Sequence, residues 1–210
     1  MPTLSSANQA ALAAREFMAR DFITIVGREI GTTTPAPFFF WSDAGTVTAG
    51  VIDPDTGLPE DRPFYGTFGL VAVGDIPRVS NATVQTVPVL MSLIDPVIEA
   101  MIRGHDLKQA RIEIHRGLFD PATRRMVDAA YLRFVGFVDE VTIPTPAEGD
   151  EAAATLTCNS HSQEMTRSNP DTRSHESQIL RSPTDNFFQD AATVGDWELF
   201  WGRKSGKLTD

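Results

Sequence analysis

The stretch Arg111-Ile112-Glu113-Ile114-His115-Arg116 alternates polar and apolar side chains from Arg111 to His115. Successive side chains of a β-strand point to opposite faces of a sheet, so this period of two predicts a strand. We expect Ile112 and Ile114 to pack on a core and the face that carries Glu113 and His115 to contact water. The segment therefore favours a sheet with one buried face as the basis of the fold.

Further strands are predicted on both sides of this segment, because runs rich in β-branched and aromatic residues are typical of strands. These runs cover residues 22–26, 38–41, 46–52, 65–73, 82–93, 126–134, 135–143 and 155–159. Pro88 lacks a backbone N–H, so we expect an edge strand or a bulge at its position. Asp95 and Pro96 predict the start of a short inserted helix, and Gly104 predicts its end.

An alanine-rich segment from Ser5 to Arg20 predicts an N-terminal helix, which Ser5 or Ser6 would cap. Such a helix either lies on its own domain or docks as an arm on a neighbouring subunit. The sequence leaves these two possibilities open.

The predicted fold class is mainly β, a barrel or sandwich with an N-terminal helix, one short inserted helix and an extended C-terminal segment. Residues 1–20 form the helical arm in this prediction, and residues 21–166 form the β domain. From residue 167 the chain becomes polar but keeps aromatic residues, which need a surface on which to bury. We therefore predict that residues 167–210 are an extension that packs between subunits.

The composition limits the classes of function. The 210 residues are 41% hydrophobic and 22% charged, enough apolar material for a core. A net charge of −10 disfavours nucleic acid as the main partner, because phosphates carry the same sign. Residues 1–14 lack a signal-peptide pattern, and no apolar run approaches about 20 residues. We therefore expect that the chain is made in the cytoplasm and does not insert into a membrane.

The search for catalytic motifs finds no phosphate-binding glycine loop, nucleophile elbow or zinc-protease helix. Cys158, the only cysteine, and His161 have metal-ligand spacing, with His175 as a third candidate, but we favour a small buried cysteine and a loop histidine. The pairs Glu60-Asp61 and Asp139-Glu140 are adjacent, so on a strand their carboxylates point to opposite faces. We therefore expect no catalytic residues, no metal and no cofactor.

The polar extension contains several arginines, and aromatic residues lie close to them in the sequence. Arginine side chains suit protein interfaces, so we prefer an assembly interface to the alternative of solvated loop charge. The candidate interface residues are Arg167, Arg173, Arg181, Phe187, Phe188, Trp197, Phe200 and Trp201.

Several short motifs follow one another in a characteristic order. They are Phe40-Trp41-Ser42-Asp43-Ala44-Gly45, Phe64-Tyr65-Gly66, Gly74-Asp75-Ile76-Pro77-Arg78, Arg103-Gly104-His105-Asp106-Leu107, Arg111-Ile112-Glu113-Ile114 and Val135-Gly136-Phe137-Val138-Asp139. The order resembles that of hub-type tail-tip proteins of long-tailed, lambda-like bacteriophages and gene transfer agents. The pieces Arg173–Gln178, Pro183–Phe188 and Phe200-Trp201-Gly202 are similar to the end of phage minor tail proteins.

The resemblance implies a non-enzymatic structural protein of the virion with a tail-tube-like β-barrel, in a trimeric or hexameric ring at the tail tip. The implied partners are further copies of the chain and other tail-tip and tail-tube proteins, with phage DNA only in transit. Some hub proteins of this group bind an iron–sulfur cluster through several cysteines. Cys158 stands alone, so that feature does not carry over, and the choice between baseplate hub and distal tail ring stays open.

A second class of function is a virion-associated carbohydrate-binding or cell-wall-degrading protein. In the binding version, Trp41, Trp197 and Trp201 would form a platform on which sugars stack. No catalytic motif favours the degrading version.

Overall fold

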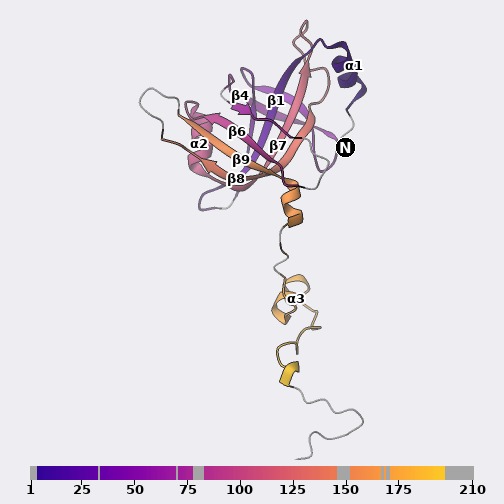
Figure 1. Ribbon diagram of the computed structural model, residues 1–210, viewed down its shortest axis with the longest axis vertical. Coiled ribbons are helices and arrows are strands. Elements are labelled where there is room, and N and C mark those ends of the chain that lie inside the picture. Colours follow the sequence, from indigo (N-terminus) through magenta and orange to yellow (C-terminus); the bar gives the residue numbers. More distant parts are fainter. Residues whose placement is uncertain are drawn as a thin grey trace, which may run out of the picture. The chain divides into compact units, whose positions relative to one another are not determined.

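The structure is a computed structural model that describes residues 4–32, 34–69, 71–77, 83–145, 152–166, 168 and 171–196. The chain divides into two compact units, Met1–Thr166 and Arg167–Asp210. Strands dominate the first unit (Figure 1), which confirms the prediction of a mainly-β fold.

The elements of the first unit are α1 (Ser6–Ala14), β1 (Met18–Glu29), β2 (Pro35–Trp41), β3 (Val47–Ile52), β4 (Pro59–Gly66), β5 (Val71–Val73), β6 (Thr86–Ser92), α2 (Pro96–Gly104), β7 (His105–Phe119), β8 (Tyr131–Thr142), β9 (Ala153–Ser160) and the 3-10 helix η1 (His161–Thr166). The second unit contains α3 (His175–Arg181) and the 3-10 helix η2 (Val194–Asp196).

The nine strands of the described chain form one sheet in the order β3-β4-β2-β1-β7-β8-β9-β6-β5. Neighbouring strands are antiparallel except β2 and β4, which are parallel. The sheet curls into a half-barrel (Figure 1). The long strands β1 and β7 lie at its centre, where Ile23 is paired with Ile114.

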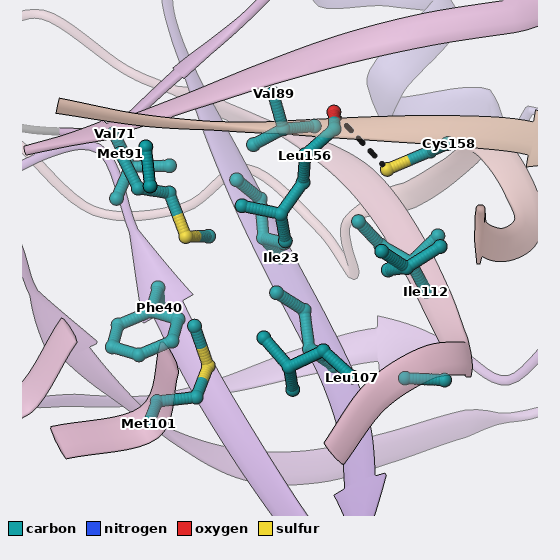
Figure 2. Packing of buried hydrophobic residues seen from close by; sticks show 14 of the residues in the cluster. Ile23, Phe40, Val71, Val89, Met91, Met101, Leu107, Ile112, Leu156 and Cys158 are labelled. Carbon is teal, nitrogen blue, oxygen red and sulfur yellow. Dashed lines mark hydrogen bonds between the residues drawn. The ribbon is translucent and has the colours of Figure 1, made fainter. Parts of the chain in front are cut away.

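The larger hydrophobic core joins side chains from one face of this curled sheet. Figure 2 shows Ile23 of β1, Phe40 of β2, Met91 of β6 and Leu156 of β9 packed together with Met101 of α2. All five side chains are almost completely buried. The interior of the half-barrel is therefore filled by side chains, and burial of this apolar area stabilises the curl.

Helix α2 begins and ends where the sequence predicts. The Asp95 carboxylate accepts hydrogen bonds from the backbone N–H groups of Val97 (2.8 Å) and Ile98 (3.3 Å), and proline occupies the first turn. Ile98, Met101 and Ile102 follow the i, i+3, i+4 spacing of one helix face, and all three are buried. The helix thus adds an apolar face to the larger core.

A second core lies on the opposite face of β1, because Phe22 points away from its neighbour Ile23. Phe22 packs against Trp41, with ring centroids 5.8 Å apart, and against Phe64, at 4.8 Å. Phe64 comes from β4, so the β3–β4 hairpin covers this face of the central strands.

The hairpin is also joined to the chain just before β8. Val51 of β3 forms a parallel bridge with Ala130. The Ile52 N–H donates to the Ala130 carbonyl (3.0 Å), and the Ala130 N–H donates to the Gly50 carbonyl (2.8 Å). These bonds satisfy polar groups at the outer edge of β3 and hold the hairpin against the second core.

The predicted N-terminal helix is too long. It ends at Ala14, because Arg15 adopts a left-handed conformation (φ 60°), and β1 already begins at Met18. The buried Asn8 side chain donates to the Ala129 carbonyl (3.1 Å), so the helix contacts its own unit.

Three predicted strand boundaries are also wrong. The strand expected over residues 65–73 is replaced by β4, which begins at Pro59, and the short β5. The strand expected over 82–93 starts only at Thr86. The pair expected over 126–143 is a single strand, β8, which runs through Phe134-Val135 without a turn. Gly136 follows directly but lies inside β8, where β9 approaches closely, so composition alone does not locate a break.

Pro88 lies in β6, which has neighbours on both sides, β9 and β5. Its carbonyl accepts from the Gly74 N–H (2.8 Å), just after β5 ends. The N–H and C=O of one residue point to the same side of an antiparallel strand. The prediction of an edge strand or a bulge is therefore wrong, since β6 is paired on both sides without a register shift. The proline is tolerated because its missing N–H would point to Gly74, just past the end of β5.

The water-exposed face predicted for residues 111–116 is wrong, although the strand itself is confirmed. Glu113 is 5% exposed and His115 is fully buried. The β3–β4 hairpin covers this face, and alternation along one strand cannot report a covering segment that is distant in sequence.

The close approach of β8 and β9 at Gly136 yields a test of this packing. A Cβ at Gly136 would overlap the backbone carbonyl of Asn159, which belongs to β9. We expect Gly136→Ala to lower the free energy of unfolding by roughly 1–3 kcal/mol in urea titrations followed by circular dichroism. Gly104→Ala is the control, since no neighbour lies within 4 Å of a Cβ there. Equal urea midpoints for the two variants would contradict this close spacing of the two strands.

Candidate functional site

The predicted interface residues fall partly within the described chain. Arg173, Arg181, Phe187 and Phe188 are described, and all four belong to the second unit. The other four, Arg167, Trp197, Phe200 and Trp201, lie outside the described residues.

Local hydrogen bonds organise the segment that carries the four described residues. Ser174 caps α3 by accepting from the Ser177 N–H (3.3 Å). The Asp185 carboxylate accepts from the Phe187 backbone N–H (3.0 Å) and from the Gln178 side chain (2.5 Å). These two bonds, the backbone one foremost, lower the pKa of Asp185. The carboxylate therefore ties the helix to the turn that presents Phe187.

Apolar side chains of this segment are open to solvent. Phe187 is 81% exposed, and its ring contacts that of Phe188 edge to face at 5.0 Å. Leu180 on α3 is 88% exposed, and α3 buries none of its residues. Sequence reasoning missed Leu180, although an Ile-Leu pair in a short polar helix was a usable signal. Exposed apolar side chains of this size are typical of surfaces that bind a partner.

The arginines of the segment contribute charge rather than local stability. Arg181 forms an ion pair with Asp171 (2.8 Å), but both side chains are well exposed, and such pairs add at most about 1 kcal/mol. Arg173 is exposed and forms no ion pair within the described part of the chain. Both guanidinium groups are therefore accessible to another molecule.

The first unit contains a partly buried ionic cluster of Arg62, Arg111, Glu60 and Glu113, with Asp53 and Asp55 at its border. Arg62 of β4 reaches Glu113 of β7 (2.7 Å) and Glu60 (2.7 Å). Arg111 binds Glu113 (2.9 Å) and Asp55 (2.8 Å). Burial lowers the pKa of Arg62, but its carboxylate partners outweigh this and the net shift is upward. The cluster is charged and paired, so it fastens the hairpin to the central strands.

His115 lies beside this cluster on the same face of β7. Its Nε2 is 2.9 Å from the Ile52 carbonyl, which can only accept, so Nε2 carries the proton in the neutral ring. Its Nδ1 is buried without a hydrogen-bond partner among the described residues. Burial, foremost among several influences, lowers the pKa of His115.

The proposed metal pair does not come together with further ligands. Cys158 is fully buried, and burial raises the pKa of its thiol to about 12. The thiol lies 3.7 Å from the Leu156 carbonyl, the contact drawn in Figure 2. His161 stacks on Phe137 at 5.4 Å. Within the described ranges, no group of three or more His, Cys, Asp or Glu side chains is placed to hold a metal ion.

Trp41 is not a sugar-stacking platform. It is 8% exposed, its ring stacks against Phe22 and Phe119, and its Nε1 donates to the Gly45 carbonyl (2.7 Å). An adjacent hollow of about 450 Å³ is lined by Arg20, Asp43 and Arg124 together with Trp41 and Phe119. Arg20 is paired with Asp43 at 2.6 Å, so much of its charge is used within the chain.

Comparison with known proteins identifies no relative, since neither a protein-family profile nor a curated protein sequence matches this chain. In the described part of the chain, every helix is too short or too polar to cross a membrane.

Replacing Arg62 tests the ionic cluster. We expect Arg62→Met to lower the free energy of unfolding by roughly 3 kcal/mol, because Glu113 stays buried with half of its cationic partners. Arg103→Met is the matched control, since the Arg103–Glu99 pair is exposed and worth less than about 1 kcal/mol. Chemical denaturation measures both, and two equally small losses would show that the cluster does not fasten the hairpin.

His115 predicts a pH dependence of stability. Its pKa is lower in the folded chain, so the unfolded chain binds the proton first, and stability falls as pH drops below about 6.5. The expected slope reaches about 1.4 kcal/mol per pH unit. His115→Gln, whose amide can still donate to Ile52, should remove this slope between pH 6.5 and 5. Unfolding titrations across that range check it, and an unchanged slope in the variant would assign the effect to other groups.

Proposed function

We propose that this chain is a structural ring component of the tail tip of a long-tailed bacteriophage, either a baseplate hub or a distal tail ring. The observation that carries the proposal is the second unit, whose apolar side chains Leu180 and Phe187 are exposed on a segment without buried helix residues. Such a segment gains stability when it packs on another subunit.

The filled interior of the half-barrel supports a ring. Residues from β1, β2, β6, β7 and β9 close-pack inside the curl, so the described part of one chain encloses no channel through this core. A tail channel for DNA would then run between subunits, with each curled sheet forming part of the wall. A tail-tube-like ring of this type uses two different faces of each subunit, which lets the circle close.

The edge of the sheet at β6 offers a site for pairing across subunits. β5 pairs only with Val89–Met91, whereas β6 begins at Thr86. Gly74 bonds to Pro88, so within the described residues only Thr86 and Val87 of β6 are paired by β9 alone, and a strand from a neighbouring copy could continue the sheet there.

The net charge of −10 suits a wall that DNA passes without binding. Like charges on the wall and on the phosphates disfavour sticking during transit. The chain would act in this way as a structural, non-enzymatic component, with the tube and other tip proteins as axial partners.

Immunogold labelling of purified virions tests this function. Antibodies against the purified chain should place gold at the distal end of the tail in negative-stain electron microscopy. Native mass spectrometry of tails released by mild dissociation should then yield trimers or hexamers. Gold on the capsid, or virions that lack the chain, would overturn the proposal and direct attention to a free sugar-binding protein.

A further inference from the structure

A groove on the first unit combines exposed apolar side chains with acidic ones. Its volume is about 480 Å³, and it is lined by residues from the end of β1, the end of α2, the start of β7 and the end of β8. Ile30 and Ile143 are 64% and 44% exposed in it. Two isoleucines open to water beside a hollow form a ready contact for large apolar side chains.

The charge around this groove is negative. Asp106, Asp139 and Glu140 line it, with Lys108 as the cation of the set. Asp106 is paired with exposed Arg28 at 3.5 Å, whereas Asp139 accepts from a neutral amide, that of Asn159 (3.0 Å). The groove therefore favours a ligand that carries positive charge beside its apolar groups.

His105 adds an unsatisfied polar atom at the same place. Its Nδ1 is buried and has no hydrogen-bond partner within the described chain, while the ring packs edge to face on Phe38 at 4.8 Å. The imidazole, held against Phe38, therefore forms part of the wall of the groove.

The C-terminal stretch of the chain itself has this combination of groups. Trp197, Phe200 and Trp201 are spaced i, i+3, i+4, the spacing of anchors on one face of a groove-bound helix. The cations Arg203, Lys204 and Lys207 follow directly. Aromatic anchors and then cations match an apolar groove with an acidic border.

We infer that residues 197–207 of one copy bind the groove of a neighbouring copy, between Ile30 and Ile143 and beside Asp139 and Glu140. The choice of a neighbouring copy rests on the proposed ring, because a tail-to-groove contact is a head-to-tail interface that can close a circle. Aromatic rings supply most of the buried area, and the cations set the orientation along the acidic border.

Charge exchange in the full-length chain tests the contact. Asp139→Lys with Glu140→Lys reverses exposed groove charges, and Arg203→Glu with Lys204→Glu reverses the tail. Each double variant should weaken self-association by roughly tenfold or more in sedimentation velocity at low salt, and combining all four should restore it. Glu16→Lys with Asp75→Lys is the control, because it makes the same change in net charge at exposed acids outside the groove.

A photo-crosslink distinguishes the neighbouring copy from the same chain. A benzophenone amino acid at Trp201, in a mixture of copies with normal and heavy nitrogen, should link to peptides of the groove in the other isotope class. Links within one copy, links to another surface, or a chain that stays monomeric overturn the inference. Rings that form and survive both charge reversals would overturn it while leaving the proposed tail-tip function standing, which the gold labelling decides separately.

Discussion

The whole first unit depends on the burial of both faces of its central strands, β1 and β7. Ile23 points into the larger core and Phe22 into the second core, because adjacent side chains of a strand leave it on opposite sides. Two covers are then required. The curl of the sheet with α2 supplies one, and the β3–β4 hairpin supplies the other. Each cover contributes its own apolar face, so neither core forms without the long-range pairing of β1 and β7.

The polar groups of the second face follow from the same constraint. Glu113 and His115 of β7 lie on the same face of the sheet as Phe22. The hairpin that covers this face removes both side chains from water. A buried carboxylate needs cations within reach, which Arg62 and Arg111 provide from two strands. A buried histidine with one partner prefers to be neutral. Apolar packing holds the hairpin on this face, and the polar contacts of the cluster and of His115 fix its exact position there.

The proposed function uses what this packing leaves on the outside. Described core side chains fill the half-barrel of the first unit, which carries an acidic groove on its surface. The second unit by itself exposes Leu180 and Phe187. These are the surface features that the proposed association of copies would use. A ring would bury them in repeated contacts, and its inner wall would carry the acidic character of the chain.

Local pattern by itself determined much of the secondary structure. The period of two identified β7, and Asp95, Pro96 and Gly104 located α2, because strand alternation and helix caps act between residues close in sequence. Arg181 and Phe187, predicted as interface residues, are exposed, as is Leu180, which the sequence reasoning missed; that they contact another subunit stays a prediction. Only the tertiary structure decided that Glu113 and His115 are buried, that Trp41 is a core residue, and that β8 is one strand. Each of these depends on segments distant in the chain. The alternation of side chains within one strand does not show whether such a segment covers it.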